Sequence, residues 1–167
     1  ATGAKLVDVA NLGAEVRQGA LRLATPGTLD NQAGLISAQR ALTVSADAAI
    51  DNRGGTIQGA STTDGASVRS NGTLDNTAGQ INANAALSLT TGTLTNTDGR
   101  IAARELTVTA GAMSSSGPAA RVLADNALTL DVQSLSQGAG SIVDGGNVSV
   151  TTRGGALGNA GAIQSGG

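Results

Sequence analysis

Apolar and polar residues follow one arrangement along the chain, and it returns after about 21 residues. The clearest unit has seven spaced positions: Leu29, Asn31, Gly34, Ile36, Ala38, Leu42 and Val44. Counted from its first Leu as zero, these are positions +2, +5, +7, +9, +13 and +15. A later unit repeats all seven without a gap: Leu74, Asn76, Gly79, Ile81, Ala83, Leu87 and Leu89. The chain is therefore an array of internal repeats.

Eight units fit this template, and they begin at Val9, Leu29, Ile50, Leu74, Leu94, Met113, Leu135 and Leu157. Successive starts lie 20, 21, 24, 20, 19, 22 and 22 residues apart. The extra residues fall at Ser61–Gly65 and at Ser114–Pro118, where we expect loops that bulge outward. We expect residues 1–167 to be one domain, with regular repeats over 26–110 and a more irregular part over 111–146.

Within each unit, positions +7 to +9 and +13 to +15 alternate apolar with polar residues, the period of two that indicates a strand. Thr and Val, which favour strands, are common in these segments. A unit of 19 to 24 residues is too short for the helix pair of a helical solenoid. We therefore predict an all-β solenoid in which equivalent short strands of successive coils pair in parallel. With a strand spacing of about 4.8 Å, eight coils make a rod about 38 Å long.

Composition narrows the possible partners. The chain has no Phe, Tyr, Trp, His or Cys, so its core must consist of Leu, Ile, Val and Ala in a narrow interior. A net charge of −2 with scattered cations and no aromatic for base stacking argues against a nucleic-acid partner. No apolar run approaches the roughly 18 residues of a membrane span. No signal-peptide pattern is present, so we expect any export to be directed by sequence outside this segment.

Asparagine recurs at position +2, as Asn11, Asn31, Asn52, Asn76, Asn96 and Asn159. Gln137 and Ser115 take the two remaining places. A ligand site needs one such amide, whereas recurrence in nearly every coil favours a structural ladder of amides that hydrogen-bond along the rod.

Glycine recurs at position +5, as Gly34, Gly55, Gly79, Gly99 and Gly140. Three residues after the Asn, we expect each of these glycines to supply a corner with positive φ between two strands.

Position +1 holds Asp30, Asp51 and Asp75 in three consecutive units. Three stacked carboxylates could hold a cation or act as acid and base. The run ends at Thr95 and Ser114, which favours a solvated outer face. Without His or Cys, the usual general base and thiol nucleophile are missing. We therefore expect no enzyme, no metal and no cofactor, and an Asp-based enzyme acting on polysaccharides is the alternative.

Three segments carry a family resemblance: residues 27–34, 72–79 and 92–99, each with the form Gly-Thr-Leu-x-Asn-x-x-Gly. They resemble the haemagglutinin repeats of filamentous haemagglutinin and of the stalks of contact-dependent growth inhibition effectors, which are two-partner secretion exoproteins of Gram-negative bacteria. The resemblance implies a right-handed parallel β-helix. It also implies export through a dedicated outer-membrane transporter and display as a long filament, and it transfers no catalytic residue.

Together these features predict a structural and adhesive stalk, either secreted or held at the outer membrane of a Gram-negative cell. The stalk would extend a binding or toxin region towards a receptor on a host or target cell, and the outer-membrane transporter would be its partner during export. In the alternative, the segment itself binds the receptor, with Ser114–Gly146 as the candidate surface.

Overall fold

The computed structural model describes residues 9–10, 14–16 and 19–166, with side chains from residue 19 onward. These residues form seventeen strands and no helix. The first nine strands are β1 (Val9–Ala10), β2 (Ala14–Val16), β3 (Leu21–Thr25), β4 (Leu29–Asp30), β5 (Leu35–Ala38), β6 (Leu42–Ala46), β7 (Ile50–Asp51), β8 (Thr56–Gly59) and β9 (Ala66–Ser70). The others are β10 (Thr73–Asp75), β11 (Gln80–Ala83), β12 (Ala86–Thr97), β13 (Arg100–Ser116), β14 (Arg121–Gln137), β15 (Ile142–Thr152), β16 (Leu157–Asn159) and β17 (Ala162–Ser165).

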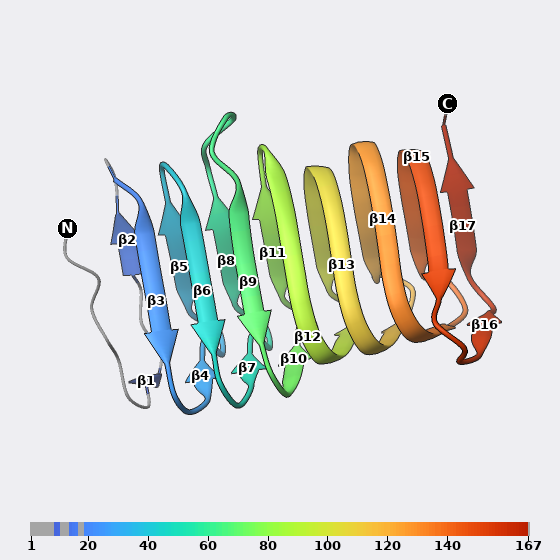
Figure 1. Ribbon diagram of the computed structural model, residues 1–167, viewed down its shortest axis with the longest axis horizontal. Coiled ribbons are helices and arrows are strands. Elements are labelled where there is room, and N and C mark those ends of the chain that lie inside the picture. The colour runs from blue at the N-terminus through green and yellow to red at the C-terminus, as the bar shows by residue number, and fades with distance from the viewer. Residues whose placement is uncertain (1–8, 11–13, 17–18, 167) are drawn as a thin grey trace.

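The strands wind into one continuous parallel β-helix of about seven turns. In Figure 1 the chain descends along β3, β6 and β9 on the near side and rises along β5, β8 and β11 on the far side. It advances towards the C-terminus while it does so, which makes the helix right-handed. Each strand pairs with its equivalents in the coils before and after it, as β7 pairs with β4 and β10. The predicted fold class is confirmed.

The strand register reproduces the predicted repeat. Leu29 pairs with Ile50, Ile50 with Leu74, and Leu74 with Leu94. The series continues through Met113 and Leu135 to Leu157. Units of 19 and of 24 residues therefore add the same single layer, because the extra residues leave the strands at the corners.

The core is a set of apolar columns that run along the rod. The first residues of the units form one column of fully buried side chains: Leu29, Ile50, Leu74, Leu94, Met113 and Leu135. The +7 residues form a second column on the facing side: Ile36, Ile57, Ile81, Ile101, Val122 and Val143. Because each layer is only a few aliphatic side chains wide, no aromatic residue is needed to fill it.

The two predicted insertions differ from each other in the structure. Residues 60–65 form a loop between β8 and β9 that protrudes from the rod, as predicted (Figure 1). The loop predicted at Ser114–Pro118 is wrong in its first half, because residues 114–116 continue β13 and pair with residues 95–97 of β12. The chain leaves the sheet only at Gly117, whose φ is 92°. Pro118 follows, and it has no N–H to donate to a neighbouring strand.

Candidate functional site

The asparagine column forms a chain of buried hydrogen bonds along one corner of the rod. Asn31 Nδ2 donates to Asn52 Oδ1 at 2.6 Å, Asn52 to Asn76 at 2.7 Å, and Asn76 to Asn96 at 2.8 Å. Each Nδ2 also reaches backbone oxygens, as Asn52 does at Gly55 and Gln80. All four side chains are buried. Their donors are used within the protein, so these amides hold coil to coil and are not available to a ligand.

Beyond Asn96, the residues of this column no longer form hydrogen bonds from one side-chain amide to the next. Asn96 Nδ2 donates to the hydroxyl of Ser115 at 3.4 Å. Gln137, one coil further, turns its Nε2 to the carbonyl oxygens of Ser141 and Ala162. Asn159, predicted as a ladder member, is exposed, and its Oδ1 accepts the Gly161 N–H of its own coil. Gln137 Nε2 donates to a backbone carbonyl of the coil that contains Asn159 and not to the Asn159 side chain, so Asn159 lies outside the ladder.

Asn11, the remaining predicted ladder member, lies outside the described residues. Its neighbour in the series, Asn31, keeps a buried Oδ1 that has no partner among the described residues.

The prediction of positive φ at the +5 glycines is wrong for most of the column and holds at Gly140, whose φ is 80°. In the regular coils the preceding residue takes that conformation: Ala33, Gly54, Ala78 and Asp98 have φ between 51° and 63°. The +5 glycine is needed because of a close approach. A Cβ on Gly79 would lie 2.1 Å from the carbonyl oxygen of Asn52, and Gly55 and Gly99 have the same contact one coil away. Only glycine lets adjacent coils pack at this corner.

The acidic column lies in register on the outer surface, since Asp51 pairs with Asp30 and Asp75. Each carboxylate accepts the backbone N–H two residues on, at 2.9 to 3.1 Å, and so closes an Asx turn. Arg53, which no repeated position marks in the sequence, lies beside this column, with its Nε 2.9 Å from Asp51 Oδ1 and 4.0 Å from Asp75 Oδ2. The hydrogen bond from Arg53 lowers the pKa of Asp51 below its ordinary value.

A guanidinium in the middle of this column opposes cation binding. In the described part of the chain, no group of three or more His, Cys, Asp or Glu side chains is arranged to hold a metal ion.

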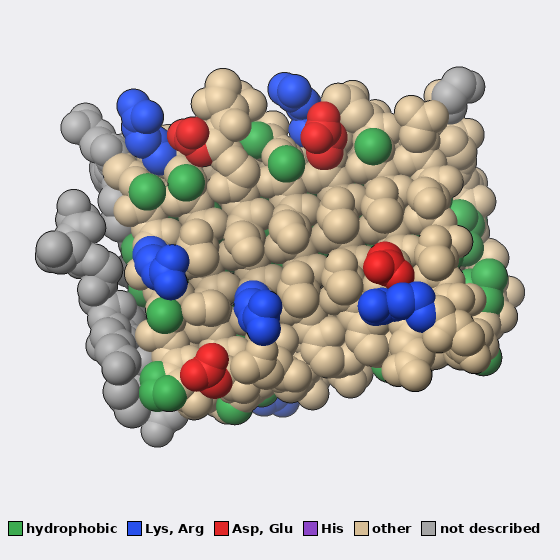
Figure 2. Space-filling view, in the orientation of Figure 1, with side chains coloured by type: hydrophobic (Ala, Val, Ile, Leu, Met, Phe, Trp, Pro, Cys, Tyr) green, Lys and Arg blue, Asp and Glu red, His purple; other side chains and the backbone are tan. Residues whose placement is uncertain are grey.

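The face formed by β3, β6, β9 and the equivalent parts of β12 to β15 is mostly uncharged (Figure 2). One column of hydroxyl residues runs along it in register: Thr43, Ser67, Ser88, Thr107, Thr129 and Ser149. An ion pair of Arg153 with Asp131, at 3.1 Å, interrupts the neutral surface near the C-terminal end. Four of these hydroxyl residues, with Glu105, line a hollow of about 440 Å³ on this face. The hydroxyls repeat along the rod and do not converge on one point.

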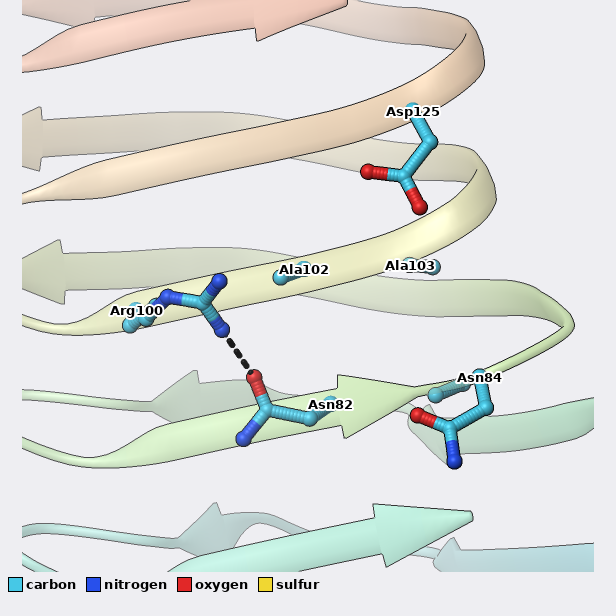
Figure 3. Close-up of a pocket in the computed structure, with 7 residues that line it drawn as sticks. Asn82, Asn84, Arg100, Ala102, Ala103 and Asp125 are labelled. Carbon is cyan, nitrogen blue, oxygen red and sulfur yellow. Dashed lines mark hydrogen bonds between the residues drawn. The ribbon is translucent and has the colours of Figure 1, made fainter. Parts of the chain in front are cut away.

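Polar side chains of different kinds converge at one hollow of about 220 Å³ (Figure 3). It spans three coils: Asn82 and Asn84 come from β11 and its end, Arg100 from β13, and Asp125 from β14. Arg100 Nη1 donates to Asn82 Oδ1 at 2.6 Å, and Asn84 Nδ2 donates to the carbonyl oxygen of Ala60 at 3.0 Å.

Two structural details produce this hollow. Ala102 lies between Asn82 and Leu123 in the register, so a methyl group stands between two longer side chains. Ala103 pairs with Ala124 and Glu105 with Ala127, so two residues of β14, Asp125 and Asn126, oppose one residue of β13. This bulge displaces Asp125 to the rim, in line with the tendency of bulges to re-aim side chains.

None of the four polar residues Arg100, Asn82, Asn84 and Asp125 is among the site residues predicted from the sequence. An available signal was position +8 of the template, where Asn82, Ala102 and Leu123 follow one another in successive units. The position of Asp125 depends on the bulge, which no residue pattern marked.

Comparison with known proteins identifies the repeat. The haemagglutinin repeat family matches the chain over residues 1–78, 59–111 and 101–161. No curated protein and no solved structure matches the chain. The described residues contain no helix of the length and apolar character needed to cross a membrane. With family matches that together reach from residue 1 to residue 161, this chain belongs to the haemagglutinin repeat family.

Proposed function

We propose that this chain is a stalk segment of a large exported protein of a Gram-negative bacterium. The observation that carries the proposal is the continuous coil-to-coil pairing from Val9 to Ile163, in which each described strand pairs only with the neighbouring coils and the register shifts only at the bulges of β13 and β14. A solenoid of this kind gains stability from each added layer, so its length can be set by the number of coils. Membership of the haemagglutinin repeat family supports an adhesin-like role.

Three sets of contacts repeat in each regular coil and resist bending. Parallel strand ladders join successive layers, aliphatic columns fill the interior, and the amide ladder ties one corner. Bending would have to stretch hydrogen bonds on one side and compress close-packed side chains on the other. Such a rod can hold a terminal domain at a set distance from a surface.

We further propose that the parent protein leaves the cell through an outer-membrane transporter of the two-partner secretion type. It would then be secreted or stay at the cell surface. The region that the rod extends would bind a receptor on a host or target cell, as an adhesin or as the toxin of a contact-dependent inhibition system. We propose no catalytic role for Asp30, Asp51 and Asp75, since each of them closes an Asx turn and Arg53 binds both oxygens of Asp51.

The experiment is a segment exchange in the intact parent protein. The five coils that begin at Leu29, Ile50, Leu74, Leu94 and Met113 are replaced by five coils of an unrelated right-handed parallel β-helix. In a second variant the same five coils are deleted. If the segment is a stalk, target-cell binding survives the exchange and falls on deletion, with surface display unchanged in both.

Loss of binding in the exchanged variant, at normal display, would refute a pure stalk and favour the receptor-binding alternative. The hollow that includes Asp125 is the observation that favours this second function. Substituting the exposed residues within Ser114–Gly146 in the natural rod then tests that surface. If binding persists after those substitutions, that surface is not the receptor site.

A further inference from the structure

The hollow beside Arg100 has two chemically different ends. Figure 3 shows Arg100 and Asn82 together at one end, Asp125 and Asn84 at the other, and Ala102 between the two ends. The first end offers hydrogen-bond donors with a positive charge. The second offers the carboxylate of Asp125 and the amide oxygen of Asn84, which are acceptors. Ala102 supplies a small apolar floor.

The guanidinium of Arg100 has a fixed orientation at its end of the hollow. The Nη1 bond to Asn82 Oδ1 orients the guanidinium, and Asn82 is itself steadied by a bond from its Nδ2 to Gln80 Oε1 at 3.4 Å. No described carboxylate forms an ion pair with Arg100, so its other N–H groups can bind an anion. A guanidinium with free N–H groups matches a planar carboxylate well.

The charges of Arg100 and Asp125 determine which ions can bind in the hollow. Asp125 would repel a divalent anion such as sulfate or phosphate, whereas Arg100 would repel a metal cation. A monoanion that also carries hydroxyl groups satisfies both ends, because hydroxyls donate to Asp125 and Asn84. An α-amino acid fits less well, because its ammonium and carboxylate share one carbon while Arg100 and Asp125 stand on opposite sides of Ala102 (Figure 3).

The size and shape of the hollow also favour a monoanion that carries hydroxyl groups. A hollow of about 220 Å³ is about seven times the roughly 30 Å³ occupied by a water molecule in the liquid, which is room for one sugar ring. The C–H face of a pyranose can lie on the methyl group of Ala102, which is half-buried, whereas the Ala103 side chain belongs to the core. The carboxyl group on C5 of a uronic acid and the hydroxyls on C2 and C3 lie at opposite edges of the ring, as the two ends require.

We propose that this hollow binds one uronic acid residue of an acidic polysaccharide. Arg100 binds the sugar carboxylate, Asp125 and Asn84 accept hydrogen bonds from ring hydroxyls, and Ala102 contacts the ring. The proposal concerns this site alone and stands whether the rod is a spacer or binds a receptor elsewhere. Because the site is shallow and wet, a single sugar should bind with a Kd of about 1 mM or weaker.

The test is an NMR titration of the isotopically labelled chain with D-glucuronate. Amide shifts are expected at Asn82, Asn84, Ala102 and Asp125. Arg100→Gln should weaken binding by about tenfold or more, since it removes a charge-assisted hydrogen bond. Ala102→Leu should abolish binding by filling the hollow, and Leu123 at the same position of the next coil shows that the fold accepts a leucine there. Arg69→Gln, on another face, is the matched control and should bind like the natural chain.

The titration is repeated with D-glucose, with acetate and with sulfate. Glucose and acetate should each bind at least about tenfold more weakly than glucuronate, because each satisfies one end of the hollow only. Sulfate should bind more weakly still. Equal binding of acetate or sulfate would reduce the site to an adventitious anion contact and overturn the proposal. Equal binding of glucose, no shift with glucuronate, or unchanged binding by a folded Ala102→Leu chain would also overturn it.

Discussion

Asn52 donates its side-chain N–H to Asn76 Oδ1 at 2.7 Å across a coil boundary, and both side chains are fully buried. The two residues are 24 positions apart in the sequence but occupy the same place in successive coils. One amide group thus stabilises two layers, as acceptor for the coil before and as donor to the coil after.

Asn76→Ala should destabilise the rod by about 2–4 kcal/mol, because it leaves Asn96 Oδ1 without its donor and removes the acceptor of Asn52. Urea unfolding followed by circular dichroism measures the loss. Asn159→Ala is the control, since its side chain is exposed, and it should cost about 1 kcal/mol or less. Equal losses of unfolding free energy in the two variants would show that a buried ladder asparagine stabilises the rod no more than an exposed one.

Gly79→Ala should cost about 3 kcal/mol or more, because its Cβ would lie 2.1 Å from the Asn52 carbonyl oxygen and force the coils apart. Gly54→Ala is the matched control at a neighbouring corner. Gly54 has positive φ, but a Cβ there meets nothing within 4 Å, so the cost is limited to the left-handed backbone, about 1–2 kcal/mol. If Gly54→Ala were the more damaging change, backbone conformation and not close approach would explain the +5 glycines.

The contrast between these glycines shows which parts of the structure could be predicted. The coil boundaries could be found because every layer needs a buried apolar residue at its start, and most layers place an Asn two residues later, as at Leu74 and Asn76. Both requirements act within one unit and leave a mark in the sequence. The contact between Gly79 and Asn52 joins two units, so the pattern of one unit cannot reveal it.

The hollow depends even more on relations between coils. Arg100, Asn82 and Asp125 belong to three units, and each is an ordinary surface residue in its own. Only the register that places Ala102 beside Asn82, and the bulge that shifts Asp125, make them neighbours. Surface positions are under weaker packing constraints than core positions, so the residue types give little warning of such a site.

Ala78→Asn should stabilise the rod by about 0.5 kcal/mol, because Ala78 has φ of 53°, a left-handed conformation that Asn and Asp tolerate better than Ala. Asp98 already occupies the equivalent position one coil later, with φ of 51°. The control is Ala86→Asn, an exposed position within β12, where Asn is disfavoured and a slight loss is expected. A shift of the urea midpoint in the same direction for both variants would contradict the backbone explanation.

The Arg53–Asp51 pair should make the free energy of unfolding depend on pH in the acidic range where Asp51 takes up a proton. The hydrogen bond from Arg53 lowers the pKa of Asp51 in the folded chain, so the unfolded chain binds the proton more tightly. The stabilisation is therefore complete above about pH 4, the ordinary range for aspartate, and is lost as pH falls through the lowered value. Because the pair is exposed, the effect should be small.

Arg53→Gln isolates this contribution. Compared with the natural chain, it should lower the urea midpoint at pH 7, and the difference should shrink as pH falls below about 4 and Asp51 becomes protonated in the folded chain. Arg69→Gln is the control, since Arg69 bonds only to the uncharged Asn71 among the described residues, and its effect should not change with pH. A difference for Arg53→Gln that persists undiminished at pH 2 would mean that Arg53 stabilises the corner by packing and not through the charge of Asp51.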